Sequence, residues 1–282
     1  MAIYHLSVKT LSRSSGRSSV GAAAYRSGER LVNELAGSVH DFGRKQGISF
    51  SAVLLPVGAP PQMASRQHLW NAVEQSETRS NSRTARELVL ALPVELCESE
   101  QVELLTGFVQ AEMVKRGMVA DVNLHDAASH NPHAHVMLTT REVTPSGFGQ
   151  KVRAWDKVEL LQEWREAWAD HCNATLADSG QAARVDHRTL REQGIQREPT
   201  RHHGVPGGFA RFKPVQPVTL SPVSPPVSFV SGVSPLPSTG QPRPDFDTAF
   251  RAAMNKPISA ALLAEMDSLN ARTGRQQGQT RL

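Results

Sequence analysis

The segment from residue 119 to residue 141, VADVNLHDAASHNPHAHVMLTTR, restricts the possible folds more than any other part of the sequence. Residues 119–125 and 134–140 each have the composition of a strand, and a short polar loop with an Asn-Pro pair joins them. Two such stretches separated by a short loop pair as an antiparallel hairpin. The fold must therefore contain a sheet, and this hairpin is part of it.

Three histidines of this predicted hairpin occupy positions that bring them together. His133 and His135 are two residues apart, so their side chains leave the same face of the strand, and antiparallel pairing brings His125 opposite them. If the register places His125 on that face, three imidazoles converge on one point. Neutral imidazoles buried together would leave several nitrogens unsatisfied, so a metal ion is favoured over three separate surface hydrogen bonds.

The number of histidines also indicates the kind of metal site. Three protein ligands leave coordination positions open, which is typical of catalytic rather than structural sites. Imidazole favours zinc, manganese, nickel or iron over magnesium, although many enzymes use an abundant hard ion instead. The pattern therefore predicts a catalytic metal site without fixing the metal.

The rest of the first 200 residues mixes strand and helix patterns. We expect an α/β fold in which a mostly antiparallel central sheet carries the three-histidine hairpin at its centre, with helices packed on it. Ser99 is expected to cap one helix, and Asp156 with Glu159 to form a capping box for another, which carries Trp164 and Trp168 as a core stripe. The predicted strands are 3–9, 48–54 and 87–93, and the predicted helices are 19–31, 62–77, 99–116 and one that Gly180 ends.

The sequence changes character at residue 204. Residues 204–244 are rich in Pro, Ser and Gly and lack the periodicity that a core needs, so they are expected to be a disordered linker. Residues 245–282 have helix-compatible spacing and a basic end, and we expect a short helical tail there. The predicted organisation is thus a folded domain over 1–203, the linker and the tail.

Composition bounds the location and the partners of the chain. The N-terminus alternates like a strand rather than a signal peptide, and no run of about 18 apolar residues occurs, so no membrane insertion is expected. Cys97 and Cys172 form no CxxC pair, which favours a reducing cytoplasm. The formal net charge of +4 permits an anionic partner but does not require one.

A nucleophile is the next requirement of a catalytic site, and the chain has 2 tyrosines. Tyr4 lies on the first predicted strand, where packing in the core explains it. Tyr25 follows three alanines on a predicted helix and precedes Arg26 and Arg30. An ordinary phenol, with a pKa of about 10, needs a nearby cation to act as a nucleophile at neutral pH. The local pattern by itself fits either a packed tyrosine or such a nucleophile.

Three motifs in a fixed order resemble a known family. MAIYHLSVKTLSRSSGRSSVGAAAYRSGER, ARELVLALPVEL and HNPHAHVMLTTR together are similar to the MobA/MobL relaxases, the mobilisation and transfer-initiation proteins of plasmids, which are related in mechanism to HUH endonucleases. The resemblance covers roughly residues 1–200. It implies that Tyr25 becomes linked to the 5′ phosphate at a nick. It also implies that His125, His133 and His135 hold a divalent metal, Mg²⁺ or Mn²⁺, that polarises the scissile phosphate.

The activity that follows from this resemblance is nicking of one DNA strand, single or locally melted, at a plasmid transfer origin. Accessory mobilisation proteins and a type IV secretion coupling protein are the partners that such a role suggests. Two alternatives remain open from the residues alone. One is a metal-dependent phosphodiesterase that uses bound water, and the other is a DNA-binding protein with a structural three-histidine metal site.

Further residues have both a functional and an ordinary interpretation. Glu87 shares a strand face with Val89 and Ala91, so it either supports the histidine site, by accepting a ring N–H or the tyrosine proton, or is an exposed strand-end glutamate. The roles of Glu95, Asp126, His130 and His187 stay open. Arg26 and Arg30 would suit a DNA phosphate. Further candidate phosphate contacts, although any one of them is more often a solvated surface charge, are Arg79, Arg83, Arg86, Lys151 and Arg153.

Overall fold

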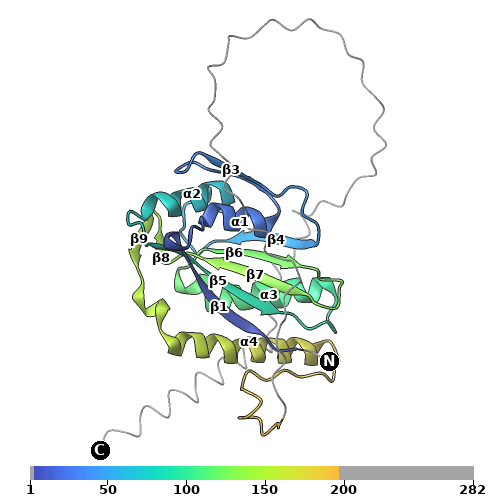
Figure 1. Cartoon of the computed structure of the whole chain (residues 1–282). Helices are drawn as coiled ribbons and strands as arrows, with labels where there is room; N and C mark the ends of the chain where they lie inside the picture. Colours follow the sequence, from blue (N-terminus) through green and yellow to red (C-terminus); the bar gives the residue numbers. More distant parts are fainter. Residues whose placement is uncertain (1–2, 197–282) are drawn as a thin grey trace, which may run out of the picture. The chain divides into compact units, whose positions relative to one another are not determined.

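The computed structural model describes residues 3–196 of the chain (Figure 1). The predicted linker over 204–244 and the predicted tail over 245–282 lie outside the described residues, so the division of the chain into domain, linker and tail stays a prediction. Within the described part, no helix combines the length and the apolar character needed to cross a membrane.

A five-stranded sheet forms the centre of this part, in the order β1-β5-β7-β6-β4. Every neighbouring pair is antiparallel, and the β6–β7 hairpin occupies an inner position, so the predicted sheet is confirmed. The strands are β1 (Leu6–Ser12), β4 (Ile48–Leu54), β5 (Arg83–Ala91), β6 (Ala120–His125) and β7 (His133–Leu138).

Helices cover both faces of the sheet (Figure 1). One face packs against α3 (Glu98–Glu112) and α4 (Val158–Asp178), with Leu88, Val122 and Val136 of the strands in that core. The other face packs against α1 (Ser19–Ser27) and α2 (Arg66–Ser76). The two Trp residues of α4 are buried in the first core, as the helical spacing predicted.

The face beneath α1 and α2 is unusual because it buries polar side chains. Asp121 on β6 is fully buried and accepts hydrogen bonds from Arg66 Nε at 2.9 Å, Trp70 Nε1 at 2.8 Å and Asn123 Nδ2 at 2.9 Å. Burying an unpaired carboxylate would cost several kcal/mol, so this network satisfies the charge where α2 crosses the sheet. It fixes α2 to β6, the strand that ends at His125.

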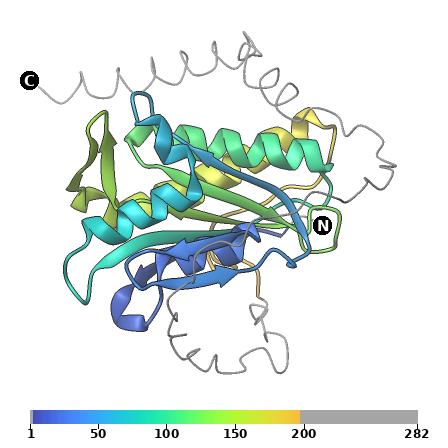
Figure 2. The same ribbon diagram turned by 90° about the horizontal axis from the view of Figure 1, so that it is seen from above.

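Several predicted boundaries were wrong, for local reasons. The first helix ends at Ser27 rather than residue 31, because Gly28 adopts a left-handed φ of 69° and the chain then enters a hairpin. That hairpin, β2 (Arg30–Asn33) with β3 (Ser38–Asp41), was not predicted, and neither was β8 (Arg141–Thr144) with β9 (Gly147–Lys151). The β8–β9 hairpin lies beside the C-terminal end of α2 (Figures 1 and 2).

Two predicted helix caps were also wrong. Cys97, not Ser99, is the N-cap of α3, where the Glu100 carboxylate accepts the Cys97 N–H at 2.8 Å. Asp156 does not cap α4, because it ends a short 3-10 helix, Arg153–Asp156, and pairs with arginines instead. The other 3-10 helices are Arg13–Ser15, Pro61–Ala64 and Val114–Arg116.

Candidate active site

The three histidines of the β6–β7 hairpin converge as predicted. Antiparallel register places His125 directly opposite His133, and His135 is two residues further along the same face. The three ring centroids are 5.0 to 5.4 Å apart. One nitrogen of each ring lies within 4.8 Å of the corresponding nitrogens of the other two, which is a group that could hold a metal ion.

Each imidazole is anchored through one nitrogen to an oxygen that can only accept a hydrogen bond. The anchoring contacts are His125 Nε2 to the Arg26 carbonyl at 2.7 Å, His133 Nδ1 to the Asn131 carbonyl at 2.9 Å and His135 Nδ1 to Glu87 Oε1 at 2.7 Å. Because the anchored nitrogens must carry the protons, Nδ1 of His125 and Nε2 of the other two rings keep a lone pair. This donor set fits a divalent metal.

Burial keeps two of these rings neutral. It lowers the pKa of His125 to about 4, against an opposing hydrogen bond to the Arg26 carbonyl and with a further lowering by Lys45. Burial likewise lowers the pKa of His135, although Glu87 opposes the shift. Both rings are therefore in the neutral form that a metal ligand requires at pH 7.

Glu87 lies on β5, on the histidine side of the sheet, where the register pairs its neighbour Val89 with His135. Its Oε1 accepts from His135 and from Arg26 Nε at 2.7 Å, and its Oε2 is 2.6 Å from an Arg26 terminal nitrogen. Burial raises its pKa, but the hydrogen bonds from His135 and Arg26 outweigh burial and lower the pKa to about 2. Both oxygens are engaged, so the geometry favours orientation of His135 over acceptance of a tyrosine proton.

Arg26 links α1 to this site in two ways. Its carbonyl accepts from His125, and its guanidinium binds Glu87 and donates to the Ala22 carbonyl at 2.7 Å. The side chain is mostly buried and directed inward. The structure thus gives Arg26 a partner other than the DNA phosphate that its position in the sequence suggested.

Tyr25 precedes Arg26 on α1 and is 50% exposed. The Phe42 ring approaches its ring edge-on, with centroids 5.2 Å apart, and Lys45 Nζ lies 4.0 Å from the ring centroid. Tyr4 differs, because it packs against the core and its hydroxyl donates to the Arg165 carbonyl at 2.8 Å. Tyr25 is therefore the accessible tyrosine of the two, and it directly precedes Arg26, whose carbonyl accepts the hydrogen bond from His125.

Lys45 was missed by the sequence reasoning. It lies between β3 and β4, in a turn with no apolar periodicity, and its distance from Tyr25 in the sequence gives no sign of the contact. The signal that could have found it is its place in a Gly-Arg-Lys-Gln-Gly turn, which combines cations with glycine flexibility.

Four of the predicted phosphate contacts line one hollow of about 390 Å³ away from the histidines: Arg83, Arg86, Lys151 and Arg153. Carboxylates already engage three of them. Asp156 pairs with Arg86 and lies 3.8 Å from Arg83, and Glu77 lies 2.8 Å from Lys151. Arg30 is elsewhere, exposed and 3.9 Å from Asp41, and Arg79 is exposed beyond α2.

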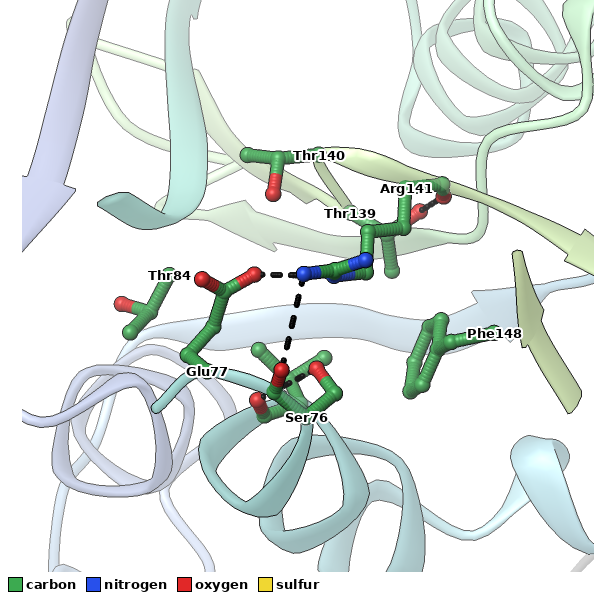
Figure 3. Close-up of a pocket in the computed structure, with 8 residues that line it drawn as sticks. Ser76, Glu77, Thr84, Thr139, Thr140, Arg141 and Phe148 are labelled. Atoms are coloured by element: carbon green, nitrogen blue, oxygen red, sulfur yellow. Dashed lines mark hydrogen bonds and ion pairs between the residues drawn. The ribbon is translucent and has the colours of Figure 1, made fainter. Parts of the chain in front are cut away.

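Glu77 also belongs to a small neighbouring pocket, where its carboxylate and the Arg141 side chain point toward one another (Figure 3). Arg141 Nε is 3.0 Å from Glu77 Oε1, so this buried carboxylate is shared between Arg141 and Lys151. The pair joins the end of α2 to the β8–β9 hairpin. We interpret it as structural.

The residues with open roles are dispersed around the site. Asp126 follows His125 with a positive φ of 53° and donates its N–H to the Gly47 carbonyl at 2.7 Å. His130 is exposed in the hairpin loop, Glu95 lies in the turn between β5 and α3, and His187 lies beyond α4. None of the four is part of the three-histidine group.

Comparison with known proteins shows which family this chain resembles. The model of the MobA/MobL family matches residues 17–208. The chain is 38% identical over 238 residues to Mobilization protein MobL of Acidithiobacillus ferridurans, covering 72% of this chain and 62% of that protein. It is 34% identical over 248 residues to Probable mobilization protein MobA of Bifidobacterium longum, covering 72% and 43%.

A solved structure described as "Molecular Basis of Vancomycin Resistance Transfer in Staphylococcus aureus" has a similar fold. Its TM-score is 0.64 at 31% sequence identity, and the match covers 67% of this chain and all of that one. The match thus covers the full length of that solved chain, whereas it covers less than two thirds of the length of each of the two curated relatives.

Proposed function

The chain belongs to the MobA/MobL family, and from this we propose that it is a DNA relaxase that nicks one strand at a plasmid transfer origin. One observation carries the proposal. The exposed Tyr25 lies on α1 directly before Arg26. The Arg26 carbonyl accepts a hydrogen bond from His125, and the Arg26 side chain donates one to Glu87. The nucleophile and the three-histidine group are therefore held by the same short piece of backbone.

The proposed reaction is a transesterification at phosphorus. The Tyr25 hydroxyl oxygen forms a bond to phosphorus, and the bond from phosphorus to the 3′ oxygen breaks. The phenol loses its proton to solvent, and the departing 3′ oxygen takes a proton from solvent and leaves as a hydroxyl. The product is a 5′-phosphotyrosine ester. Because this ester retains much of the energy of the phosphodiester, attack by a 3′ hydroxyl can reverse the reaction and rejoin the strand.

The residues fit a divalent cofactor. His125, His133 and His135 would hold it, and as Mg²⁺ or Mn²⁺ it would withdraw negative charge from the phosphate. Glu87 and the Arg26 carbonyl fix the tautomers and orientations of two of these rings, which is the support that metal-binding imidazoles need. The substrate is expected to be single-stranded or locally melted, because a duplex would hold its backbone away from Tyr25.

The same proposal extends to the setting of the reaction. We expect the protein to act in the cytoplasm together with accessory mobilisation proteins and a type IV secretion coupling protein. These partners rest on the family alone, and no surface of the described residues is assigned to them.

A covalent-capture experiment tests the activity. The protein is incubated with Mn²⁺ or Mg²⁺ and a pool of single-stranded oligonucleotides that carry a random internal stretch and a label at one end. A 3′ label should migrate with the denatured protein, whereas a 5′ label should be released on a fragment with a free 3′ hydroxyl. Sequencing the captured DNA would also give the nick site.

Two variants separate the proposal from its rivals. Tyr25→Phe should abolish both cleavage and adduct, and Tyr4→Phe, which changes the other tyrosine, should retain both. Cleavage that persists in Tyr25→Phe would instead indicate a phosphodiesterase using bound water. Tight DNA binding without nicking in any metal would indicate a DNA-binding protein with a structural metal site.

A further inference from the structure

Residues 42–47, which we call the strap, connect β3 to β4 and contact both halves of the proposed active site. At one end the Phe42 N–H donates to the Glu29 carbonyl, just beyond α1, at 3.3 Å. At the other end the Gly47 carbonyl accepts the N–H of Asp126, the residue after His125, at 2.7 Å. The strap therefore joins the helix of the nucleophile to the hairpin of the histidines.

Residues of the strap contact both the backbone and the ring of Tyr25. Lys45 Nζ donates to the Tyr25 carbonyl at 2.8 Å and lies 4.0 Å from the centroid of the Tyr25 ring, which is within cation–π range. Phe42 adds an edge-on contact to the same ring, with an interplanar angle of 88°. A half-exposed tyrosine would otherwise sample several rotamers, so these contacts restrict where its hydroxyl points.

The Lys45 ammonium is kept in a place that does not favour it. Burial, and then the charge of Arg26, lower its pKa to about 8, while Asp126 opposes the shift. Within residues 3–196, no carboxylate lies at ion-pair distance from this ammonium, although most cations around the site have one. Instead of a carboxylate, the ammonium has a carbonyl in the last turn of α1 and the face of the Tyr25 ring as partners.

We propose that Lys45 is a positioning residue that holds the Tyr25 ring in the orientation needed for attack and keeps a positive charge beside the phosphate being attacked. This inference rests on the proposed function. It assigns Lys45 to the same chemistry as Tyr25, through contacts with the tyrosine ring and backbone rather than with the histidines.

Three variants test the proposal in the full chain. Lys45→Met removes the charge and keeps a similar length, Lys45→Arg keeps the charge, and Arg44→Met removes one charge from the exposed neighbouring position. The rate of adduct formation is measured in a single turnover, with Mn²⁺ and the captured oligonucleotide at saturation. Lys45→Met should be slower by about 10- to 100-fold, the range expected when a group that orients a nucleophile is lost. Lys45→Arg and Arg44→Met should stay within about threefold of the unchanged protein, well inside that range.

Affinity, melting and NMR measurements separate positioning from folding or binding. Mn²⁺ affinity and melting temperature should be unchanged in Lys45→Met, and oligonucleotide affinity should fall by no more than a few-fold, the loss expected for one cation that faces a phosphate. In a Tyr4→Phe background Tyr25 is the one remaining tyrosine, so ¹³C-labelled tyrosine gives a single set of ring NMR signals. Lys45→Met should shift these signals, and Arg44→Met should not.

The possible failures are distinguishable. If the unchanged protein forms no adduct, the relaxase proposal fails, and the NMR comparison still tests the contact between Lys45 and Tyr25. Normal adduct formation in Lys45→Met, or an equal loss in Arg44→Met, would overturn the role of Lys45 alone. So would a Lys45→Arg protein that is as slow as Lys45→Met.

Discussion

The two ends of the central sheet carry polar side chains that are held in opposite ways. At one end, where Ala91 of β5 pairs with His133 of β7, each of three imidazoles uses one nitrogen in an internal hydrogen bond and keeps the other. At the other end, where Arg86 pairs with Leu138, three of four cations in the basic hollow already have carboxylate partners. The first end needs a ligand to complete it, whereas at the second two carboxylates, Asp156 and Glu77, offset part of a net positive charge.

This difference predicts where a substitution should matter most. Loss of a group at the histidine end removes an interaction that the protein cannot replace. Loss of a cation in the basic hollow, lined by Arg83, Arg86, Lys151 and Arg153, changes a positive charge that nearby carboxylates and solvent already weaken. Effects on activity should therefore fall steeply from the histidine end to the basic end.

The largest effect is expected from removal of a histidine. His135→Ala leaves two ligands and frees Glu87 from its hydrogen bond, so Mn²⁺ affinity should fall by about 100-fold or more, since loss of a supporting partner alone costs about 10- to 100-fold. Adduct formation at limiting metal should fall in parallel. Isothermal titration with Mn²⁺ measures the affinity.

His130→Ala is the matched control, because it removes an exposed histidine from the loop of the same hairpin. It should bind Mn²⁺ as the unchanged protein does. Equal losses in the two variants would show that the three-histidine group is not the metal site, and the contrast between the two ends of the sheet would lose its basis.

An intermediate effect is expected from Glu87→Gln. This change keeps the shape of the side chain but removes the charge that holds both His135 and Arg26, so Mn²⁺ affinity should fall by about 10- to 100-fold. Excess metal should restore most of the adduct formation, because the three ligands remain. If excess metal restores nothing, Glu87 acts in proton transfer rather than in orientation.

Much of the histidine end could be predicted from the sequence, because its determinants are local. The strands of the hairpin are adjacent in the chain, and period-two alternation fixes which faces His133 and His135 occupy. The same alternation placed Glu87 on a face with Val89 and Ala91. The pairing of β5 with β7 places that face beside the histidines. No sequence pattern within β5 predicts this pairing.

Two short hairpins and two long-range contacts were harder to predict. The β2–β3 and β8–β9 hairpins are short and half-exposed, so they lack a clear apolar alternation. The inward turn of Arg26 depends on Glu87, 61 residues later. Lys45 meets Tyr25 only because the strap folds back over α1. The partners of Arg26 and Lys45 lie 61 and 20 residues away along the chain, so the spacing around either residue does not identify its partner.

The smallest effects are expected at the basic end, and their direction is more informative than their size. If the hollow contacts DNA phosphates, Arg153→Ala should weaken binding of a single-stranded oligonucleotide by a few-fold and reduce the salt dependence of binding by about one contact. Asp156→Asn should do the reverse at low salt, because it removes the carboxylate that engages Arg83 and Arg86. Fluorescence anisotropy across a salt series measures both, with melting temperatures to show that each variant folds.

Opposite signs in these two variants would mean that Asp156 limits the attraction of the hollow for DNA, and that this carboxylate restrains binding. Weaker binding in both would instead mean that Asp156 holds the arginines in a conformation that binds DNA, so the carboxylate assists the contact. No change in either would remove the hollow from the DNA path. The histidine end would then act with contacts elsewhere, and the exposed Arg30 beside α1 would be the next cation to test.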